Sequence, residues 1–339
     1  MQEQAHEFER MSLCDEENIK ELKDFLYQNE LNLDDFIELF LVKRNEEGKI
    51  IACGGIAPNV IKCFAIDSRY RGQGIALSLA SQLIQEAAKR GYHQLFIYTK
   101  PKNADLFAGC GFYPIEQVPN QVLLLENSPV KLKRYQQQLR QLRQPGQKIG
   151  AIVMNANPFT LGHRYLVETA LSQCDWLHLF VVGEDKSQFS YLDRLALVKA
   201  GTADLSRLTI HEGTPYIISR ATFPCYFLKY KNIVHQCHME LDLRIFRRFI
   251  APPLGITHRF VGNEPTCIIT NYYNQQMQIW LQSPEIDAPI IEKVEIRRVR
   301  FKRDAISASK VRALLAQGNL AAVQHYVPQT TYDFLRQYS

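Results

Sequence analysis

Long hydrophobic runs, paired cysteines and a strong excess of one charge are all missing from this sequence. No apolar stretch approaches the ~20 residues that a membrane-spanning helix needs. The first residues, MQEQAHEFER, are polar and acidic, so we expect no secretory signal. The eight cysteines among 339 residues are scattered and form no CxxC pair, which is typical of reduced thiols. We therefore expect a cytoplasmic protein with no membrane partner.

The charge balance is only mildly basic. Lysine and arginine number 40 against 35 acidic residues, a net charge of +5. This weakly favours anionic ligands, but the clustered basic surface of a nucleic-acid-binding protein is lacking, so we predict no nucleic-acid partner. The segment HQCH at 235–238 carries two histidines and a thiol that suit zinc, yet nothing nearby completes a tetrahedral set. We predict no protein-bound metal, and a packing or hydrogen-bonding role for HQCH.

A basic segment divides the chain. Residues 131–148 contain six basic residues and no acidic one. Apolar residues at 132, 135, 139 and 142 predict one apolar helix face, and Pro145-Gly146 ends the helix. The charged face is either simply solvated or a docking surface for an acidic partner. Because the chain is too long for one typical core, we predict two domains, at 1–128 and 149–339, joined by a linker helix at 129–148.

The order of predicted elements differs on the two sides of this linker. Before it, helices are expected at 16–29, 76–91 and near 103–109, and strands at 49–57, 60–67, 94–99 and near 121–126. After it, apolar strands and amphipathic helices alternate, which predicts right-handed parallel βαβ units. The fold class is therefore α/β, with a mixed α+β first domain and a Rossmann-like parallel second domain.

The stretch RYRGQGIA at 69–76 stands between a predicted strand and a predicted helix. Its glycines let backbone N–H groups face an anion at a helix N-terminus, although glycines also serve ordinary turns. With the downstream segments NADLF and GF, residues 10–126 resemble the GNAT acetyltransferases. That resemblance implies that a CoA-like arm binds here, on Arg69, Arg71, Gly72, Gly74 and Asn103.

Phe107 departs from the GNAT pattern. Many GNAT enzymes carry a tyrosine there that protonates the leaving thiolate, and phenylalanine has no proton to give. The resemblance therefore favours binding of a CoA-like arm over ordinary acetyl donation from acetyl-CoA.

The stretch NPFTLGH at 157–163 follows the apolar run IGAIVM and precedes a helix. It is either an ordinary loop with one surface histidine or an anion site. It resembles the (H/T)xGH signature of the nucleotidyltransferases. That resemblance implies catalytic roles for His163 and Thr160 at the α-phosphate of ATP, where preorganised donors stabilise the developing charge. We expect Gly162 to keep side-chain atoms away from the nucleotide.

A matching segment, ISASKVRALLAQGN, lies at 306–319. Ser307 is the predicted N-cap and Gly318-Asn319 the predicted end of this helix. In the same superfamily such a segment holds the β- and γ-phosphates. Arg194, Arg220 and the strand end FVGNEP (260–265) are further, weaker candidates. The predicted nucleotide-binding residues are Asn155, Asn157, Phe159, Gly162, His163, Gly262, Ser307, Ser309, Lys310 and Arg312.

Over essentially its whole length the chain resembles the citrate lyase ligase family, on stretches such as RYRGQGIALSLA, IGAIVMNANPFTLGHRYLVETA and ISASKVRALL. The resemblance implies a ligase that uses ATP and Mg²⁺ to acetylate a thiol. Acetate would form acetyl-adenylate and pyrophosphate. The acceptor would be the dephospho-CoA-like prosthetic group on the acyl carrier subunit of citrate lyase, with release of AMP.

Two alternatives stay open. The second domain could be a cofactor adenylyltransferase acting on a pantetheine phosphate or on nicotinamide mononucleotide, with an accessory GNAT domain. The GNAT half could instead be an inactive scaffold that docks the carrier protein through the basic helix. The sequence does not say in which domain acetyl transfer occurs.

Overall fold

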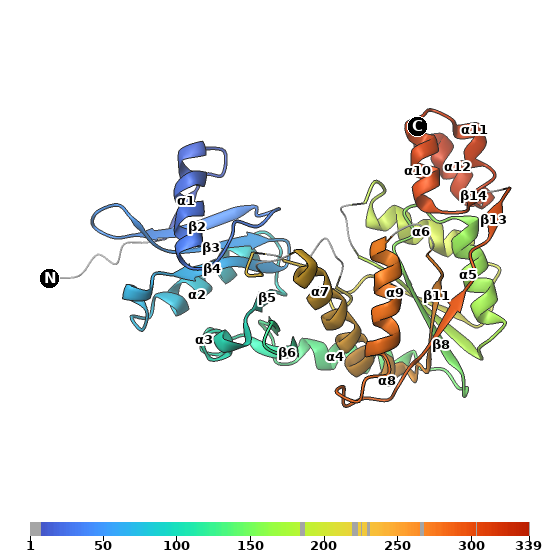
Figure 1. The fold of residues 1–339 in the computed structure, drawn as a ribbon, viewed down its shortest axis with the longest axis horizontal. Coiled ribbons are helices and arrows are strands. Elements are labelled where there is room, and N and C mark those ends of the chain that lie inside the picture. Colours follow the sequence, from blue (N-terminus) through green and yellow to red (C-terminus); the bar gives the residue numbers. More distant parts are fainter. Residues whose placement is uncertain are drawn as a thin grey trace. The chain divides into compact units, whose positions relative to one another are not determined.

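A computed structural model describes residues 8–183, 187–218, 223–224, 226–228, 231–264, 268–302 and 304–338. The chain divides into two compact units (Figure 1). The first comprises Met1–Arg134 and Phe223–Leu241, and the second Tyr135–Thr222 and Asp242–Ser339. The domain limits at 128 and 149 stay a prediction, since this division instead places a segment of the C-terminal half with the first unit. The candidate Arg220 lies outside the described residues.

The first unit is built on a seven-stranded sheet in the order β1-β2-β3-β4-β5-β7-β6. Its strands are β1 (Glu9–Met11), β2 (Leu39–Arg44), β3 (Ile50–Ala57), β4 (Val60–Ile66), β5 (Phe96–Thr99), β6 (Tyr113–Val118) and β7 (Val122–Glu126). Its helices are α1 (Glu16–Gln28), the 3₁₀ turns η1 (Ser68–Tyr70) and η2 (Pro101–Asn103), α2 (Ile75–Lys89) and α3 (Ala104–Ala108).

Strands β4 and β5 are the parallel neighbours in this sheet. Val60 pairs with Phe96 and Ile61 with Ile97, and no later residues of the two described strands are in register. Just beyond these pairs, Cys63 has a φ of +52°, and the register between β3 and β4 shifts at Cys53–Gly55. The carboxyl-terminal halves of β4 and β5 therefore separate, which leaves space between them for a ligand.

The second unit has a five-stranded, all-parallel sheet in the order β10-β9-β8-β11-β12. The strands are β8 (Ile149–Met154), β9 (Trp176–Val181), β10 (Leu208–His211), β11 (His258–Gly262) and β12 (Glu292–Ile296). The strand order reverses between β8 and β11. In open parallel sheets a ligand crevice forms outside the carboxyl ends of the strands at such a switch point.

Helices cover both faces of this sheet (Figure 1). They are α5 (Leu161–Leu171), α6 (Tyr191–Gly201), the π-helical η3 (Phe246–Ile250), α8 (Ala251–Leu254) and α9 (Ile268–Trp280). On one face Ile152 and Leu179 pack against Val167 of α5 and Val198 of α6. On the other, the Phe180 ring lies edge-on to Phe246 of η3, 6.0 Å away. Burial of both faces explains the near-continuous apolar strands.

The C-terminal helices form a smaller cluster. Its elements are β13 (Arg300–Phe301), β14 (Asp304–Ala305), α10 (Ala308–Ala316), α11 (Leu320–Val323) and α12 (Gln329–Tyr338). Val311, Val323 and Leu335 pack there against Phe189 and Ile306. Helices α4 (Lys131–Gln141) and α7 (Lys231–Ile245) each span a boundary of the two-unit division.

The prediction of an α/β fold with a mixed first half and a parallel second half is confirmed. The expected elements at 16–29, 49–57, 60–67 and 76–91 correspond to α1, β3, β4 and α2. Strands β1, β2 and β6 were not expected. Within the described ranges, no helix is long and apolar enough to cross a membrane.

Candidate functional site

The turn after β8 is held in place by its asparagines. The Asn157–Pro158 peptide bond is cis, and Asn157 is buried. The Asn157 side chain accepts a hydrogen bond from the Phe189 N–H at 3.2 Å. Its main-chain oxygen accepts one from Nη1 of Arg312 at 2.6 Å. Asn157 thus joins the turn after β8 to helix α10, far away in the sequence.

Thr160 and His163 form a reciprocal cap at the start of α5. The Thr160 hydroxyl accepts from the His163 N–H at 3.3 Å, and Nδ1 of His163 accepts from the Thr160 N–H at 3.0 Å. Because Nδ1 accepts, the neutral ring carries its proton on Nε2. Burial and then the positive charge of Arg298 lower the pKa of His163 to about 4. His163 is therefore neutral near pH 7 and offers an Nε2–H donor.

Phe159 and Gly162 fix how this turn packs. The Phe159 ring is buried and stacks on the His163 ring at 5.7 Å. A Cβ on Gly162 would lie 2.7 Å from the main-chain oxygen of Ile306. The expectation was that Gly162 leaves room for a nucleotide. That expectation stays a prediction, and the structure shows a packing role beside it, because the glycine lets α5 approach the residue before α10 closely.

The ISASKVR segment takes the predicted form. Ser307 caps α10, and its Oγ accepts from the Lys310 N–H at 3.2 Å and lies 3.0 Å from Oγ of Ser309. Burial lowers the pKa of Arg312, whose guanidinium reaches Asn157. Through the Arg312–Asn157 hydrogen bond and the close contact at Gly162, the N-termini of α5 and α10 lie next to each other beyond the carboxyl end of β8. The two motifs are thus brought together.

Gly262 ends β11, the strand next to β8 at the point where the strand order reverses. Its main-chain oxygen accepts from Nδ2 of Asn274 in α9 at 3.0 Å. The next residue, Asn263, accepts from the Arg298 N–H at 2.8 Å, and Arg298 also pairs with Glu264 at 2.5 Å. Sequence reasoning missed Arg298. The signal that could have found it is its place just after β12, at the carboxyl edge of the sheet where the crevice lies.

Asn155 is engaged by a buried arginine. Nη1 of Arg194 donates to the main-chain and side-chain oxygens of Asn155, both at 2.7 Å, and to the Val182 oxygen at 2.9 Å. Nδ2 of Asn155 reaches the Ser187 hydroxyl at 3.1 Å. Arg194 is fully buried, so this candidate supports the loop after β8.

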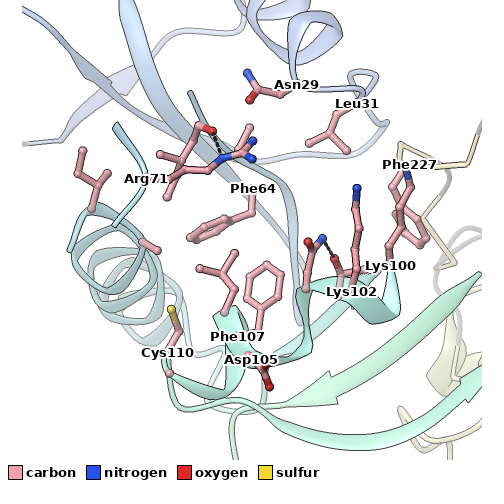
Figure 2. A pocket seen from close by; sticks show the side chains of 18 of the residues that line it. Asn29, Leu31, Phe64, Arg71, Lys100, Lys102, Asp105, Phe107, Cys110 and Phe227 are labelled. Atoms are coloured by element: carbon pink, nitrogen blue, oxygen red, sulfur yellow. Dashed lines mark hydrogen bonds between the residues drawn. The ribbon is translucent and has the colours of Figure 1, made fainter. Parts of the chain in front are cut away.

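A second candidate site lies within the first unit, where β4 and β5 separate. A cavity of about 850 Å³ opens there (Figure 2). Its walls include β4, the loop before α2, the end of β5, α3 and the segment Tyr226–Phe227. Of the residues predicted to bind a CoA-like arm, four line the cavity: Arg71, Gly72, Gly74 and Asn103.

The fifth predicted residue of this set, Arg69, is not among the lining residues. Its guanidinium pairs with Asp67 at 2.6 Å and is largely exposed. The loop after it is shaped by Gly72 and Gly74, whose φ values of +80° and +78° favour glycine. Nε of Arg71 donates to the Ile66 oxygen at 3.2 Å, as Figure 2 shows.

The inner wall of the cavity is apolar. Phe107 is 3% exposed and lies edge-on to Phe64 at 5.2 Å. Lys100 and Lys102 lie at the other side of the cavity, with Phe227 nearby (Figure 2). Sequence reasoning missed Tyr226 and Phe227, since nothing local marks a segment of the C-terminal half as part of the first unit.

The HQCH segment lies on α7. Cys237 and His238 are buried, and the His238 ring packs edge-on against Phe223 at 5.5 Å. Among the described residues, no group of three or more histidine, cysteine or acidic side chains could hold a metal ion.

Two family models match this chain, one in each half. The family model for the citrate lyase ligase C-terminal domain matches residues 149–335, and that for the GNAT acetyltransferases matches 3–112. The "[Citrate [pro-3S]-lyase] ligase" of Escherichia coli K12 is 53% identical over 97% of this chain and 93% of its own. The Haemophilus influenzae protein of the same name is 50% identical over 97% of this chain and 98% of its own.

Among solved structures, a putative acyl-CoA N-acyltransferase from Klebsiella pneumoniae is 21% identical with a TM-score of 0.29, over 35% of this chain and 95% of its own. The alignments with the Escherichia coli and Haemophilus influenzae proteins extend over nearly the full length of this chain and of those relatives, so they include both candidate sites. The chain belongs to the citrate lyase ligase family.

Proposed function

We propose that this chain uses ATP and acetate to acetylate the prosthetic thiol of citrate lyase. An acetate oxygen attacks the α-phosphate of ATP, and the bond to pyrophosphate breaks to leave acetyl-adenylate. The thiol of the dephospho-CoA-like group on the acyl carrier subunit then attacks the acetyl carbonyl and releases AMP. The observation that carries this proposal is the 53% identity, over 97% of the chain, to a protein named for ligating citrate lyase.

The crevice of the second unit suits the first half-reaction. The neutral His163 ring donates from Nε2 to an α-phosphate oxygen, where charge builds as the fifth bond to phosphorus forms. The dipole of α5 adds positive potential at its N-terminus. Ser307, Ser309 and Lys310, in the first turn of α10, hold the departing pyrophosphate. Mg²⁺ enters with ATP as part of the nucleotide substrate.

The cavity of the first unit suits the arm that carries the thiol. The glycine loop before α2 faces the pyrophosphate of the arm, and Arg71 supplies a positive charge beside it. Phe107 fits this chemistry because the thiol arrives as a nucleophile and no leaving thiolate needs a proton. We place the reaction in the cytoplasm, with neither a nucleic acid nor a membrane as partner.

ATP–pyrophosphate exchange with the purified chain tests the proposal. Exchange that requires acetate, in the absence of any carrier protein, supports carboxylate adenylation by this polypeptide. Exchange that instead requires pantetheine phosphate or nicotinamide mononucleotide would favour a cofactor adenylyltransferase. The second half-reaction is followed by acetylation of the carrier with and without its prosthetic arm.

A further inference from the structure

Arg259 is a buried arginine with two guanidinium nitrogens that find no hydrogen-bond acceptor in the part of the chain that the structure describes. It lies on β11 and is 3% exposed. Neither its Nε nor its Nη1 has a hydrogen-bond acceptor among the described residues. The Phe246 ring, 4.3 Å from the guanidinium carbon, provides a cation–π contact but no acceptor. A guanidinium keeps its proton even where burial lowers its pKa, as it does here, so the charge stays.

Two other buried arginines of the same unit, Arg247 and Arg194, donate hydrogen bonds to main-chain carbonyl oxygens. Arg247 is 1% exposed. It donates to the main-chain oxygens of Ser283, Ala288, Trp280 and Pro289, at 2.7–3.0 Å. Arg194 is likewise surrounded by carbonyl oxygens. An uncompensated buried charge is costly, so the lack of acceptors at Arg259 is unusual for this molecule.

The His178 side chain, on the same face of the sheet, also has a buried nitrogen without a hydrogen-bond partner among the described residues, but it carries no charge. Arg259 is in register with Ala151 of β8, and Ala151 with His178 of β9, so the three side chains project from one face. Nε2 of His178 is buried and has no hydrogen-bond partner among the residues that the structure describes. Burial and then the neighbouring His211 lower the pKa of His178 to about 3, so that ring is neutral. Arg259 is the group that calls for an anion.

The surroundings of Arg259 place it towards the catalytic crevice. Asp242, on α7, accepts from the Ile218 N–H at 2.9 Å and from the Tyr273 hydroxyl at 2.5 Å. It attracts Arg259 electrostatically without a hydrogen bond between them. Tyr273 adjoins Asn274, whose amide binds the oxygen of Gly262 at the carboxyl end of β11. Arg259 is thus linked, through Asp242 and Tyr273, to the helix whose Asn274 binds the carboxyl end of β11.

We propose that Arg259 binds the carboxylate of the acid substrate and presents it to the α-phosphate. This inference rests on the proposed function. A planar guanidinium fork matches a carboxylate, and each oxygen keeps a lone pair for attack. The Phe246 ring beside the guanidinium offers an apolar surface to a methyl group, and Ala151 at the neighbouring position has the smallest apolar side chain. The chemistry selects a short monocarboxylate.

The test compares Arg259→Met with its matched control Arg247→Met. Both variants should lower the melting temperature, because Arg259→Met leaves the buried Asp242 without its positive neighbour and Arg247→Met leaves four carbonyls without a donor. In ATP–pyrophosphate exchange, Arg259→Met should raise the KM for acetate by roughly 10- to 100-fold with the KM for ATP within about twofold. Folded Arg247→Met should keep the wild-type KM for acetate.

Arg259→Lys, which keeps the charge but loses the fork, should give an intermediate KM. An acetate KM within about twofold of wild type in Arg259→Met, or in Arg259→Lys if the methionine variant does not fold, would overturn the assignment.

Acetate-dependent melting of the whole chain separates this inference from the proposed function. Sodium acetate should raise the melting temperature of the wild type above that in equimolar sodium chloride, and Arg259→Met should lose this difference. If acetate supports no exchange but still stabilises the wild type and not the variant, the carboxylate site stands while the proposed reaction fails. If acetate does not stabilise the wild type more than chloride does, the site assignment is wrong.

Discussion

The two turns that lead into helices α2 and α5 both contain glycine, but the glycines have different structural roles. Gly72 and Gly74 have positive φ values, and a Cβ at either position would meet nothing within 4 Å. Gly162 is helical, and a Cβ there would lie 2.7 Å from the Ile306 oxygen. The first turn needs glycine for backbone conformation, the second for close packing.

This difference teaches what each turn can tolerate. A Cβ at Gly72 or Gly74 would enter open space, so the shape of the loop before α2 is set locally, and the arm that we propose to bind there meets backbone. The turn before α5 is fixed by partners far away in the sequence, at Phe189, Ile306 and Arg312. A local change should therefore stay local in the first turn and spread to α10 in the second.

The largest effect is expected from His163→Ala. This change removes the Nε2–H donor that we propose acts on the α-phosphate, and loss of one such donor typically lowers kcat by roughly 10²–10³-fold. It also leaves the Thr160 N–H without its acceptor, at a cost of about 1 kcal/mol of folding free energy. ATP–pyrophosphate exchange measures the first effect and thermal unfolding the second.

His163→Asn is the control that separates the two effects. An asparagine oxygen can accept from the Thr160 N–H and restore the cap, but its side chain is too short to replace the Nε2–H. Stability should return while exchange stays low. Exchange near the wild-type rate in both variants would remove His163 from the chemistry.

Gly162→Ala paired with Gly74→Ala tests the comparison directly. In Gly162→Ala the new Cβ meets a main-chain oxygen, so α5 or α10 must shift, and we expect a loss of about 1–3 kcal/mol together with a raised KM for ATP. In Gly74→Ala the positive φ costs about 1–2 kcal/mol, with no clash. Its KM for ATP should be unchanged. An equal rise of that KM in both variants would break the distinction.

The same contrast explains how much could be predicted from the sequence. The cap at Ser307, the βαβ order and the end of α10 near Gly318 depend on residues close in the chain, and these predictions are confirmed. The role of Gly162 depends on Ile306, and that of Asn157 on Arg312. No local pattern encodes such pairs, because the fold alone decides which distant segments meet.

Arg298 and Phe227 were missed for related reasons. Arg298 looks like one of several basic residues in a polar stretch until β12 places it at the edge of the crevice. Phe227 lies in the C-terminal half, and only the compact division groups its segment with the first unit. Arg69 was named from its place in the motif, but its side chain pairs with Asp67 and does not line the cavity.

A fall in pH should destabilise the second unit before the first, because different groups titrate in the two units. In the second unit, burial lowers the pKa of His178 to about 3 and of His211 to about 4, from 6.5. The unfolded chain therefore binds protons first, so stability is full above pH 6.5 and falls as the pH drops towards 3, by about 2 kcal/mol at pH 5 for the first histidine. In the first unit, Lys89 and Arg90 hold the pKa of Glu86 at about 2, and its contribution declines only below pH 4.5.

Hydrogen exchange at pH 7.5 and pH 5 measures this contrast amide by amide. Protection in β8 and β9 should fall at pH 5, while protection in β3 and β4 should hold. The double variant His178→Leu/His211→Leu should reduce the pH dependence of the second sheet, and His163, whose pKa is also lowered, should account for part of what is left. Equal loss of protection in both sheets would mean that the histidine pair does not govern acid stability.

The smallest effect is expected from Phe227→Ala. Phe227 lines the cavity of the first unit, and removing its ring takes away one apolar wall from the proposed arm site. A loss of about 1 kcal/mol corresponds to a roughly fivefold higher KM for the carrier. Acetate-dependent ATP–pyrophosphate exchange should be unchanged, since the proposed first half-reaction uses the other unit.

Tyr27→Ala, which removes an aromatic ring that is 79% exposed and outside the cavity lining, is the matched control and should alter neither activity. A carrier KM that stays at the wild-type value in Phe227→Ala would exclude this wall from arm binding, whereas a parallel fall in exchange would show that the two half-reactions share the cavity.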